Sequence, residues 1–121
     1  MNKVILVVDD DEDVTMIIEE ILKTADYEVL VAHDGPHAVE KTHEHRIDLV
    51  LMDIRMPNFS GLWFCEIFKH KPQTRNIPIV MISSAFHPED VEKARQLGVK
   101  ACLKKPFDSK ELLEAVEKAI A

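Results

Sequence analysis

Four apolar stretches of this sequence lead into side chains that can bind cations or take part in phosphoryl chemistry. Those side chains are Asp9 with Asp10, then Asp53, Ser83 and Lys105. If the stretches are parallel strands of an open α/β sheet, their carboxyl ends share one edge, and such sheets bind ligands in the crevice outside it. Three carboxylates, a hydroxyl and an ammonium group would then meet in one place. That set suits a divalent cation together with a phosphoryl group.

Each residue type has its own part in the chemistry that this set predicts. Asp9 and Asp10 repel each other unless a cation lies between them, and Mg²⁺ fits because it is hard and takes carboxylate, water and phosphate oxygens. Asp53 can attack phosphorus through its carboxylate and form an acyl phosphate. Ser83 can donate a hydrogen bond to a phosphoryl oxygen, and Lys105 supplies a compact positive charge. Taken singly, each could be an ordinary strand-end or helix-capping residue; their shared position favours a site.

The elements that would position these residues alternate between strand and helix, a pattern typical of doubly wound α/β folds. Apolar runs predict the strands, and apolar residues at helical spacing predict the helices. The predicted strands are Val4–Val8, Tyr27–Ala32, Leu49–Met52, Ile77–Ile82 and Ala101–Lys104. Four of the predicted helices begin near Asp13, Asp34, Pro88 and Asp108, and the third follows a loop that includes Gly61. We expect Gly98 to end the fourth helix, and Asp108 with Glu111 to form a capping box at the fifth.

Other residues are assigned to the core or to the surface. The third predicted helix follows a turn-rich loop marked by Pro57, Asn58, Ser60 and Gly61, and it turns inward Phe64, Cys65 and Phe68. Trp63 and Ile67 are offset from that inward face. We expect them to point outward, either towards a partner or a second copy, or partly covered by neighbouring loops. The histidines show no zinc spacing, and all are expected on the surface: His33, His37, His43, His45, His70 and His87.

The composition is that of one globular domain, with 121 residues of which 46% are hydrophobic and 31% charged. We expect a single domain over residues 1–121 with no output domain. The formal net charge of −7 argues against direct binding of nucleic acid, which usually needs a basic surface. No apolar run approaches the roughly 18–20 residues of a membrane helix, and no signal peptide is recognisable. Because Cys65 and Cys102 make no disulfide framework, we expect a cytoplasmic protein that does not contact membranes.

In these motifs the sequence resembles the receiver domains of bacterial response regulators, over nearly the whole chain from Val4 to Ile120. The segments that carry the resemblance are Ile5–Asp11, Leu51–Pro57, Gly61–Leu62, Pro78–Ser84 and Lys104–Phe107. The resemblance implies a flavodoxin-like fold, a single doubly wound (βα)5 α/β sandwich with parallel strands in the order 2-1-3-4-5. That order would place the first and third strands side by side where the winding of the chain reverses.

The resemblance also implies a role for each acidic residue. Asp53 is the expected phosphoacceptor, and it also stands among the expected ligands of Mg²⁺. Asp10 would bind the metal directly, and Asp9 would act on it largely through water. The backbone carbonyl of Arg55 would supply one more ligand.

Ser83 and Lys105 stand where the family binds the phosphoryl group, and the peptide bond from Lys105 to Pro106 is expected to be cis. The phosphoryl donor implied by the resemblance is a sensor histidine kinase or a histidine phosphotransfer protein. The domain would catalyse its own phosphorylation and slow dephosphorylation, acting as a switch and not as a metabolic enzyme. We expect a downstream protein target, which the sequence does not name, and a monomer or a weak phosphorylation-dependent dimer.

Four residues are assigned to the switch and the rim of the site: Ser84, Ala85, Cys102 and Pro106. Cys102 stands where the family has a Tyr or Phe that rotates behind the phosphate, and a thiol is too small for that movement. We therefore expect the signal to leave through the loop after Ser83 and through the fourth helix. Arg55, at the rim, could reach the phosphoryl group, form a salt bridge, or remain solvated. We predict that Arg55 and Ala85 tune the lifetime of the phosphate.

Three other interpretations remain. The chain could be a receiver fragment of a longer regulator or hybrid kinase, or a pseudo-receiver that keeps the fold without the phosphorylation. A haloacid-dehalogenase-type phosphatase would use Asp11 as its nucleophile, in the run Asp11–Thr15. Two observations disfavour the phosphatase, because Asp11 lies two residues too late after the first strand and no acidic pair for Mg²⁺ follows Lys105.

Overall fold

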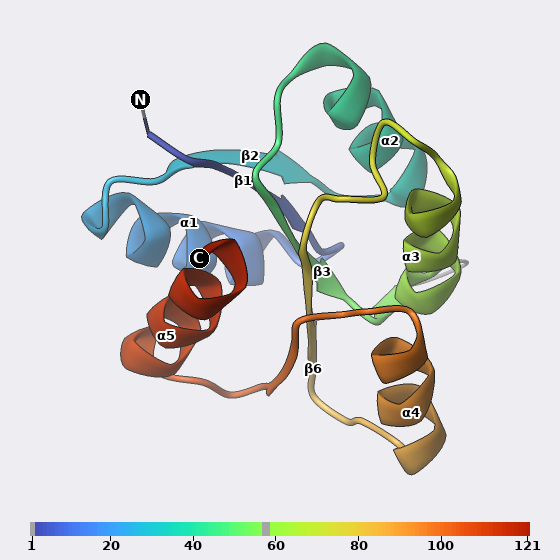
Figure 1. Cartoon of the computed structure of the whole chain (residues 1–121). Helices are drawn as coiled ribbons and strands as arrows, with labels where there is room; N and C mark the ends of the chain where they lie inside the picture. Colours follow the sequence, from blue (N-terminus) through green and yellow to red (C-terminus); the bar gives the residue numbers. More distant parts are fainter. Residues whose placement is uncertain (1, 57–58) are drawn as a thin grey trace.

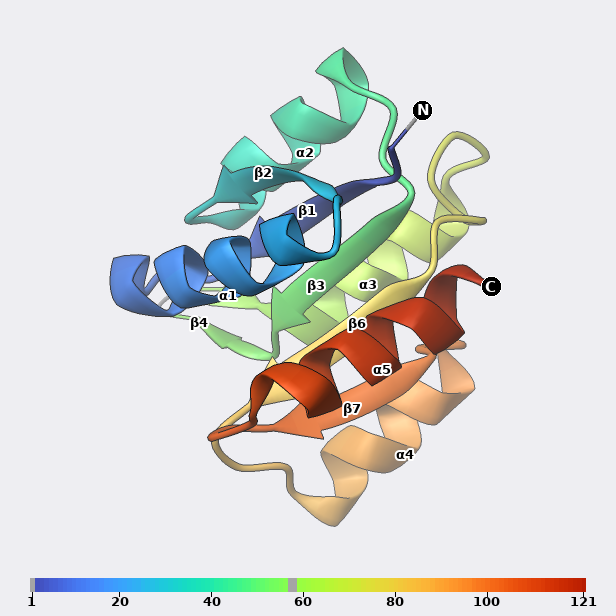
Figure 2. The ribbon, with the colours of Figure 1, turned by 90° about the vertical axis from the view of Figure 1, so that its left-hand side faces the viewer.

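The protein is described here by a computed structural model that covers residues 2–56 and 59–121, the side chain of Phe59 excepted. Its centre is a parallel sheet of five strands with helices on both faces (Figures 1 and 2). The strands are β1 (Val4–Val8), β2 (Glu28–Ala32), β3 (Leu49–Asp53), β6 (Ile79–Ser83) and β7 (Ala101–Lys104). Their order across the sheet is β2-β1-β3-β6-β7. The predicted flavodoxin-like order 2-1-3-4-5 is therefore confirmed.

The helices divide between the two faces of the sheet. One face is covered by α1 (Glu12–Thr24) and α5 (Ser109–Ile120). The other is covered by α2 (Gly35–Glu44), α3 (Gly61–His70) and α4 (Pro88–Gln96). No helix within the described residues is long and apolar enough to span a lipid bilayer.

Both faces of the central strands are buried, and these strands are apolar except for the last residues of β3 and β6, Asp53 and Ser83. In β1, Leu6 and Val8 pack under the helices of one face, and Ile5 and Val7 pack under those of the other. All five residues of β3 are buried in the same way. Burial of one such aliphatic side chain contributes about 1.5–3 kcal/mol, so the two cores fix the strand ends firmly. Continuous apolar runs of this kind are typical of parallel sheets.

The first helix begins at Glu12, next to the expected start near Asp13. The Asp11 side chain is its N-cap and accepts hydrogen bonds from the backbone N–H groups of Asp13 and Val14. On this helix Ile17 is 56% exposed. Its neighbour Ile18 is fully buried instead.

A short antiparallel hairpin between β3 and α3 was not predicted. It pairs β4 (Arg55–Met56) with β5 (Phe59–Ser60). The loop expected here is therefore wrong at Ser60, which lies in β5 and caps α3, and at Gly61, which is the first residue of that helix. The expectations for Pro57 and Asn58 fall outside the described residues.

The ends of the later helices follow the expected signals. Asp108 accepts a hydrogen bond from the Glu111 backbone N–H at 2.8 Å, and Glu111 accepts one from that of Asp108 at 3.3 Å. This is the predicted capping box of α5. Gly98, with φ of 80°, follows the end of α4. On α3, Trp63 points outward and is 56% exposed, whereas Ile67 is half-buried.

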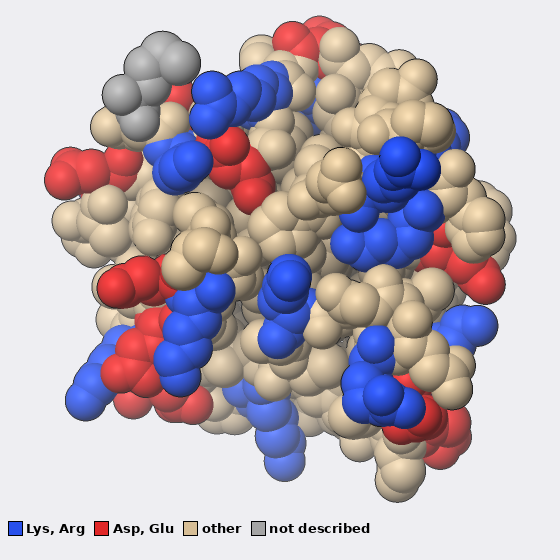
Figure 3. Space-filling view, viewed as in Figure 1, with Lys and Arg blue, Asp and Glu red and all other residues tan. Residues whose placement is uncertain are grey.

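The charged side chains on the outside of the protein are mixed in sign. On the face seen in Figure 3, Lys and Arg side chains lie beside Asp and Glu side chains. Ion pairs at the surface include Lys23 with Glu19 and Arg46 with Asp48. Exposed pairs of this kind contribute little to stability, typically about 0.2–1 kcal/mol each.

Candidate functional site

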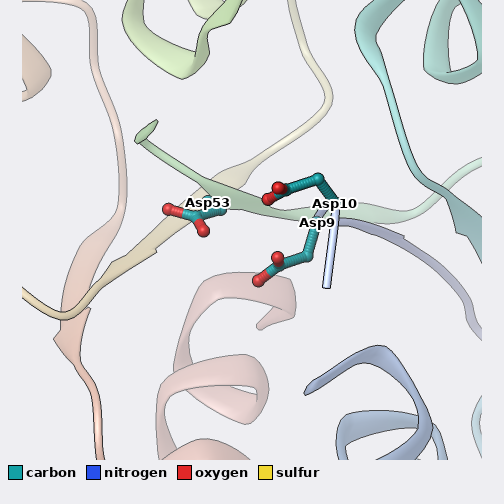
Figure 4. A group of neighbouring side chains, drawn as sticks. All are labelled: Asp9, Asp10 and Asp53. Atoms are coloured by element: carbon teal, nitrogen blue, oxygen red, sulfur yellow. The ribbon is translucent and has the colours of Figure 1, made fainter. Parts of the chain in front are cut away.

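Three carboxylates meet where β1 and β3 end. One carboxylate oxygen from each of Asp9, Asp10 and Asp53 lies within 4.8 Å of the other two, and Figure 4 shows the three side chains together at the strand ends. Asp9 is fully buried and Asp53 is 7% exposed, whereas Asp10 is exposed. The strand order produces this meeting, because β1 and β3 are neighbours in the sheet.

Asp9 is held in place by its surroundings on three sides. Its Oδ1 accepts the backbone N–H of Asp11 at 3.0 Å, and its own N–H donates to the carbonyl of Ala32 at 3.1 Å. Nδ1 of His33 lies 2.9 Å from the carbonyl oxygen of Asp9. His33 and His37 are both half-buried, so the expectation that all histidines lie on the surface is wrong at these two positions. The place of His33 directly after β2, at the same sheet edge, was the signal that could have revealed its contact with Asp9.

Lys105 joins two of the carboxylates. Its Nζ donates to Oδ2 of Asp9 at 2.9 Å and to Oδ2 of Asp53 at 3.2 Å. Its backbone N–H donates to the carbonyl of Ser83 at 2.8 Å, and the bond to Pro106 is cis, as predicted. Burial alone would lower the pKa of Lys105, but its hydrogen bonds to Asp9 and Asp53 and their negative charges outweigh burial and raise it. The ammonium group therefore stays charged.

Asp53 is less favourably placed as an anion. Burial raises the pKa of its carboxyl group, and the nearby charge of Asp9 raises it further. A hydrogen bond from the Arg55 backbone N–H to Oδ1, at 3.0 Å, and the contact with Lys105 act in the opposite direction without cancelling the rise. The site without a cation thus carries excess negative charge, which is the condition that a divalent ion relieves.

Gly61 is required by the close approach of α3 to the backbone of Asp53 and Ile54. A Cβ atom at Gly61 would lie 2.6 Å from the carbonyl oxygen of Asp53 and 2.9 Å from Cα of Ile54. Both are backbone atoms, so they cannot give way as a flexible side chain would. The Gly61 N–H donates to the carbonyl of Ile54 at 2.9 Å. The sequence indicated only a loop at this glycine, whereas it shapes the wall behind Asp53.

Ser83 lies at the same edge, but its hydroxyl group is engaged with its own loop. It donates to the carbonyl of Ala85 at 2.9 Å and accepts the Ala85 N–H at 3.2 Å. Ser83 is 2% exposed, and Ser84 and Ala85 are exposed. To contact a phosphoryl group on Asp53, the hydroxyl would have to turn away from Ala85.

Three positions assigned to the rim and the switch, Arg55, Cys102 and Pro106, differ in their surroundings. Of the three outcomes considered for Arg55, the structure contains the salt bridge, which is made to Asp90 in the first turn of α4. Cys102 lies exposed on β7 at the edge of the sheet, and Pro106 is also exposed. The side chain of Cys102 is therefore outside the buried core where an aromatic residue would pack.

The donor set fits a hard divalent cation. All three side chains offer carboxylate oxygens, which Mg²⁺ prefers, and the exposure of Asp10 leaves room for the waters that this ion keeps. Lys105 forms ion pairs with Asp9 and Asp53. The arrangement can therefore hold a cation and an anionic group side by side.

Comparison with known proteins agrees with this geometry. The profile of the family called response regulator receiver domain matches residues 5–117. The polar-differentiation response regulator DivK of Brucella anthropi is 30% identical over 117 residues, which cover 97% of this chain and 95% of that protein. The transcriptional regulatory protein CpxR of Escherichia coli K12 is 34% identical over 116 residues. That match covers 96% of this chain but only 48% of CpxR.

Solved structures show the same likeness in three dimensions. The chemotaxis protein CheY4 of Vibrio cholerae superposes with a TM-score of 0.93 at 28% sequence identity, over 98% of this chain and 99% of that one. The region matched by the family profile contains the whole sheet apart from Val4, and it includes every residue of the acidic cluster and Lys105. With a family match over nearly its whole length and the same fold, the chain belongs to the response regulator receiver domains of two-component signalling.

Proposed function

We propose that the chain accepts a phosphoryl group on Asp53 from a phosphohistidine, carried by a sensor histidine kinase or a histidine phosphotransfer protein, and that the transfer depends on Mg²⁺. The observation that carries this proposal is the position of Asp53 between two acidic neighbours and Lys105 at one sheet edge. A carboxylate in that position has a cation site on one side and a fixed ammonium group on the other. Phosphoryl transfer needs little more than this positioning and charge neutralisation.

The proposed ligands of Mg²⁺ are the carboxylates of Asp9, Asp10 and Asp53 and the backbone carbonyl of Arg55. Bound there, the ion would offset the negative charge of Asp53 and of the phosphoryl oxygens. Asp9 is the most buried of the three aspartates, and the hydrogen bond from the Asp11 backbone N–H to its Oδ1 orients its carboxylate.

In the proposed transfer, a carboxylate oxygen of Asp53 forms a bond to phosphorus while the bond from phosphorus to the donor imidazole nitrogen breaks. The electron pair of the broken bond stays on the imidazole, which leaves as the free side chain of the donor. Lys105 remains protonated and neutralises one negative charge of the phosphoryl group. Ser83 turns its hydroxyl from Ala85 towards a phosphoryl oxygen. Hydrolysis then returns the Asp53 carboxylate and inorganic phosphate, because water attacks phosphorus and the acyl oxygen leaves.

We further propose that the donor protein covers the apolar cleft beside the site. The cleft holds about 320 Å³ and is lined by Val14, Ile17, Ile18, Ser84, Lys105, Pro106 and Phe107. Lys105 is both a wall of this cleft and a direct partner of Asp53, so a protein seated there could present its histidine to Asp53. Ile17 and Met16, 56% and 59% exposed, extend the apolar surface along α1.

The competing functions lack such support. A phosphatase would need Asp11 as a nucleophile, but the Asp11 side chain caps α1 through the N–H groups of Asp13 and Val14. A pseudo-receiver would not need the buried contact of Lys105 with Asp9 and Asp53. That the chain acts as one domain without an output domain, as a monomer or weak dimer, stays a prediction.

The proposal is tested by phosphorylation with acetyl phosphate, which needs no protein donor. Wild type should become phosphorylated with Mg²⁺ and should not do so with EDTA. Asp53→Asn should remain unmodified, and Lys105→Met should lose most of the reaction while keeping its fold by circular dichroism. Equal phosphorylation with and without the metal would refute the metal dependence.

A further inference from the structure

One ion pair joins the loop after Asp53 to the first turn of α4. Nη2 of Arg55 donates to Oδ2 of Asp90. The same oxygen accepts the backbone N–H of His87 at 3.1 Å, at the N-terminal end of the helix. The Asp90 side chain is 15% exposed and that of Arg55 is 51% exposed. The carboxylate is thus held by the helix, whereas about half of the Arg55 side chain is exposed to solvent.

Arg55 is also attached to the phosphoacceptor position. Its backbone N–H donates to Oδ1 of Asp53 at 3.0 Å, and only one residue separates the two in the chain. A single residue therefore links the carboxylate that would receive phosphorus with the start of α4. None of the other described ion pairs connects this loop with that helix.

The helix that Arg55 holds is weakly packed. Of the nine residues of α4, only Ala94 is buried. A second described ion pair ties the helix to α3, between Lys93 and Glu66 at 3.5 Å, and both of its side chains are more than 40% exposed. Figure 2 shows α4 at the β7 end of the sheet, behind the edge strand. An element with so little buried surface is the kind that shifts when its tethers change.

Phosphorylation would create a competitor for Asp90. An acyl phosphate carries about one negative charge more than the carboxylate it replaces, by analogy with other phosphorylated side chains. The planar guanidinium group suits phosphate oxygens in two-pronged hydrogen bonds. Because Arg55 starts at the rim of the site, the new charge appears beside the cation that now pairs with Asp90.

We propose that the ion pair between Arg55 and Asp90 is a latch that phosphorylation of Asp53 opens, so that Arg55 turns to the phosphoryl oxygens and α4 loses its tether. The latch rests on the proposed function, because it needs a phosphoryl group on Asp53. Coupling between two such events is reciprocal. If a phosphoryl group opens the latch, then removal of the latch must favour binding of a phosphoryl group.

The test uses the full chain with Mg²⁺ and beryllofluoride, a non-covalent stand-in for the phosphoryl group, in calorimetric titrations. Asp90→Asn removes the charge that holds Arg55 but keeps an oxygen to accept the His87 N–H. It should bind beryllofluoride about threefold more tightly than wild type, the size of one surface ion pair. The matched control is Glu66→Gln, which cuts the other tether of α4 and also removes one negative charge, and it should bind as wild type does. In an Arg55→Gln background, Asp90→Asn should change nothing.

Hydrogen exchange supplies a second readout. Beryllofluoride on wild type and Asp90→Asn without ligand should both speed amide exchange in the first turn of α4. Equal tightening by Asp90→Asn and Glu66→Gln would overturn the latch, because loosening of α4 alone would then explain the gain. A gain that survives Arg55→Gln, or an Asp90→Asn variant that binds as wild type does, would overturn it as well. Wild type that fails to bind beryllofluoride with Mg²⁺ would instead refute the proposed function.

Discussion

Asp53→Asn should make the metal-free protein more stable, although it removes the proposed phosphoacceptor. At a separation of 4.8 Å, the upper limit for the carboxylate oxygens of the cluster, two unit negative charges repel by about 0.9 kcal/mol at the dielectric constant of water and by about 3.5 kcal/mol at an effective value of about 20. Asp53 makes two such contacts, with Asp9 and Asp10. The attraction between its Oδ2 and Nζ of Lys105, 3.2 Å apart, stabilises the folded state by about 1.3 to 5 kcal/mol over the same range of dielectric constant. The repulsion therefore exceeds the attraction by about 1 kcal/mol.

The predicted gain is measured by thermal unfolding in EDTA. About 1 kcal/mol corresponds to a rise of about 4 °C in Tm for a domain of this size. With Mg²⁺ at ten times its Kd, wild type should gain about 1.4 kcal/mol, and the advantage of the variant should vanish because it has lost a ligand. The control is Asp26→Asn, which changes an exposed aspartate outside the site. The difference in stability between this variant and wild type should be the same with and without Mg²⁺. If Asp53→Asn were less stable than wild type in EDTA, the account of an overcharged site would be wrong.

Three further predictions follow from the same geometry. Because burial raises the pKa of Asp53, the folded state holds the proton of this carboxyl group more tightly than the unfolded state does. The free energy of unfolding of metal-free wild type, measured by denaturant titration, should therefore equal that of Asp53→Asn at low pH and become smaller than it as the pH rises above 3.8. Gly61→Ala should lower the free energy of unfolding by about 1–3 kcal/mol and slow phosphorylation by acetyl phosphate, because the new Cβ would displace the backbone of Asp53. The control is Gly98→Ala, which is strained only by its φ of 80°. It should lower the free energy of unfolding by about 1 kcal/mol and be phosphorylated at the wild-type rate. Ile17→Ser should reduce the rate of phosphoryl transfer from a histidine kinase at least threefold and leave the rate with acetyl phosphate unchanged, since only the protein donor would cover the cleft. An equal loss of rate with both donors would show that the donor protein does not bind at the cleft.

The fold could be predicted because its signals are local and strong. Strands buried on both faces, such as Val4–Val8, are continuous apolar runs, and caps such as Asp108 with Glu111 mark a helix start directly. The site followed from the fold, since parallel strands deliver their last residues to one edge. The meeting of Asp9, Asp10, Asp53 and Lys105 needed no knowledge of side-chain packing.

What the sequence could not supply are contacts that depend on the final packing. Asp90 lies 35 residues from Arg55, and many acidic residues could have been its partner. The hydrogen bonds of Ser83 with Ala85 depend on one rotamer in a loop. The exposure of Ile17 could not be predicted, because helical spacing identifies a stripe of the helix but not how far the neighbouring elements cover it.

The central claim is that Asp53 receives the phosphoryl group, and chemical mapping tests it most directly. The chain is phosphorylated with acetyl phosphate and Mg²⁺, the acyl phosphate is reduced with borohydride, and the modified residue is located by peptide mass spectrometry. The account predicts that aspartate 53, and no other, is converted to homoserine. Conversion at Asp11, or undiminished phosphate incorporation by Asp53→Ala, would contradict it.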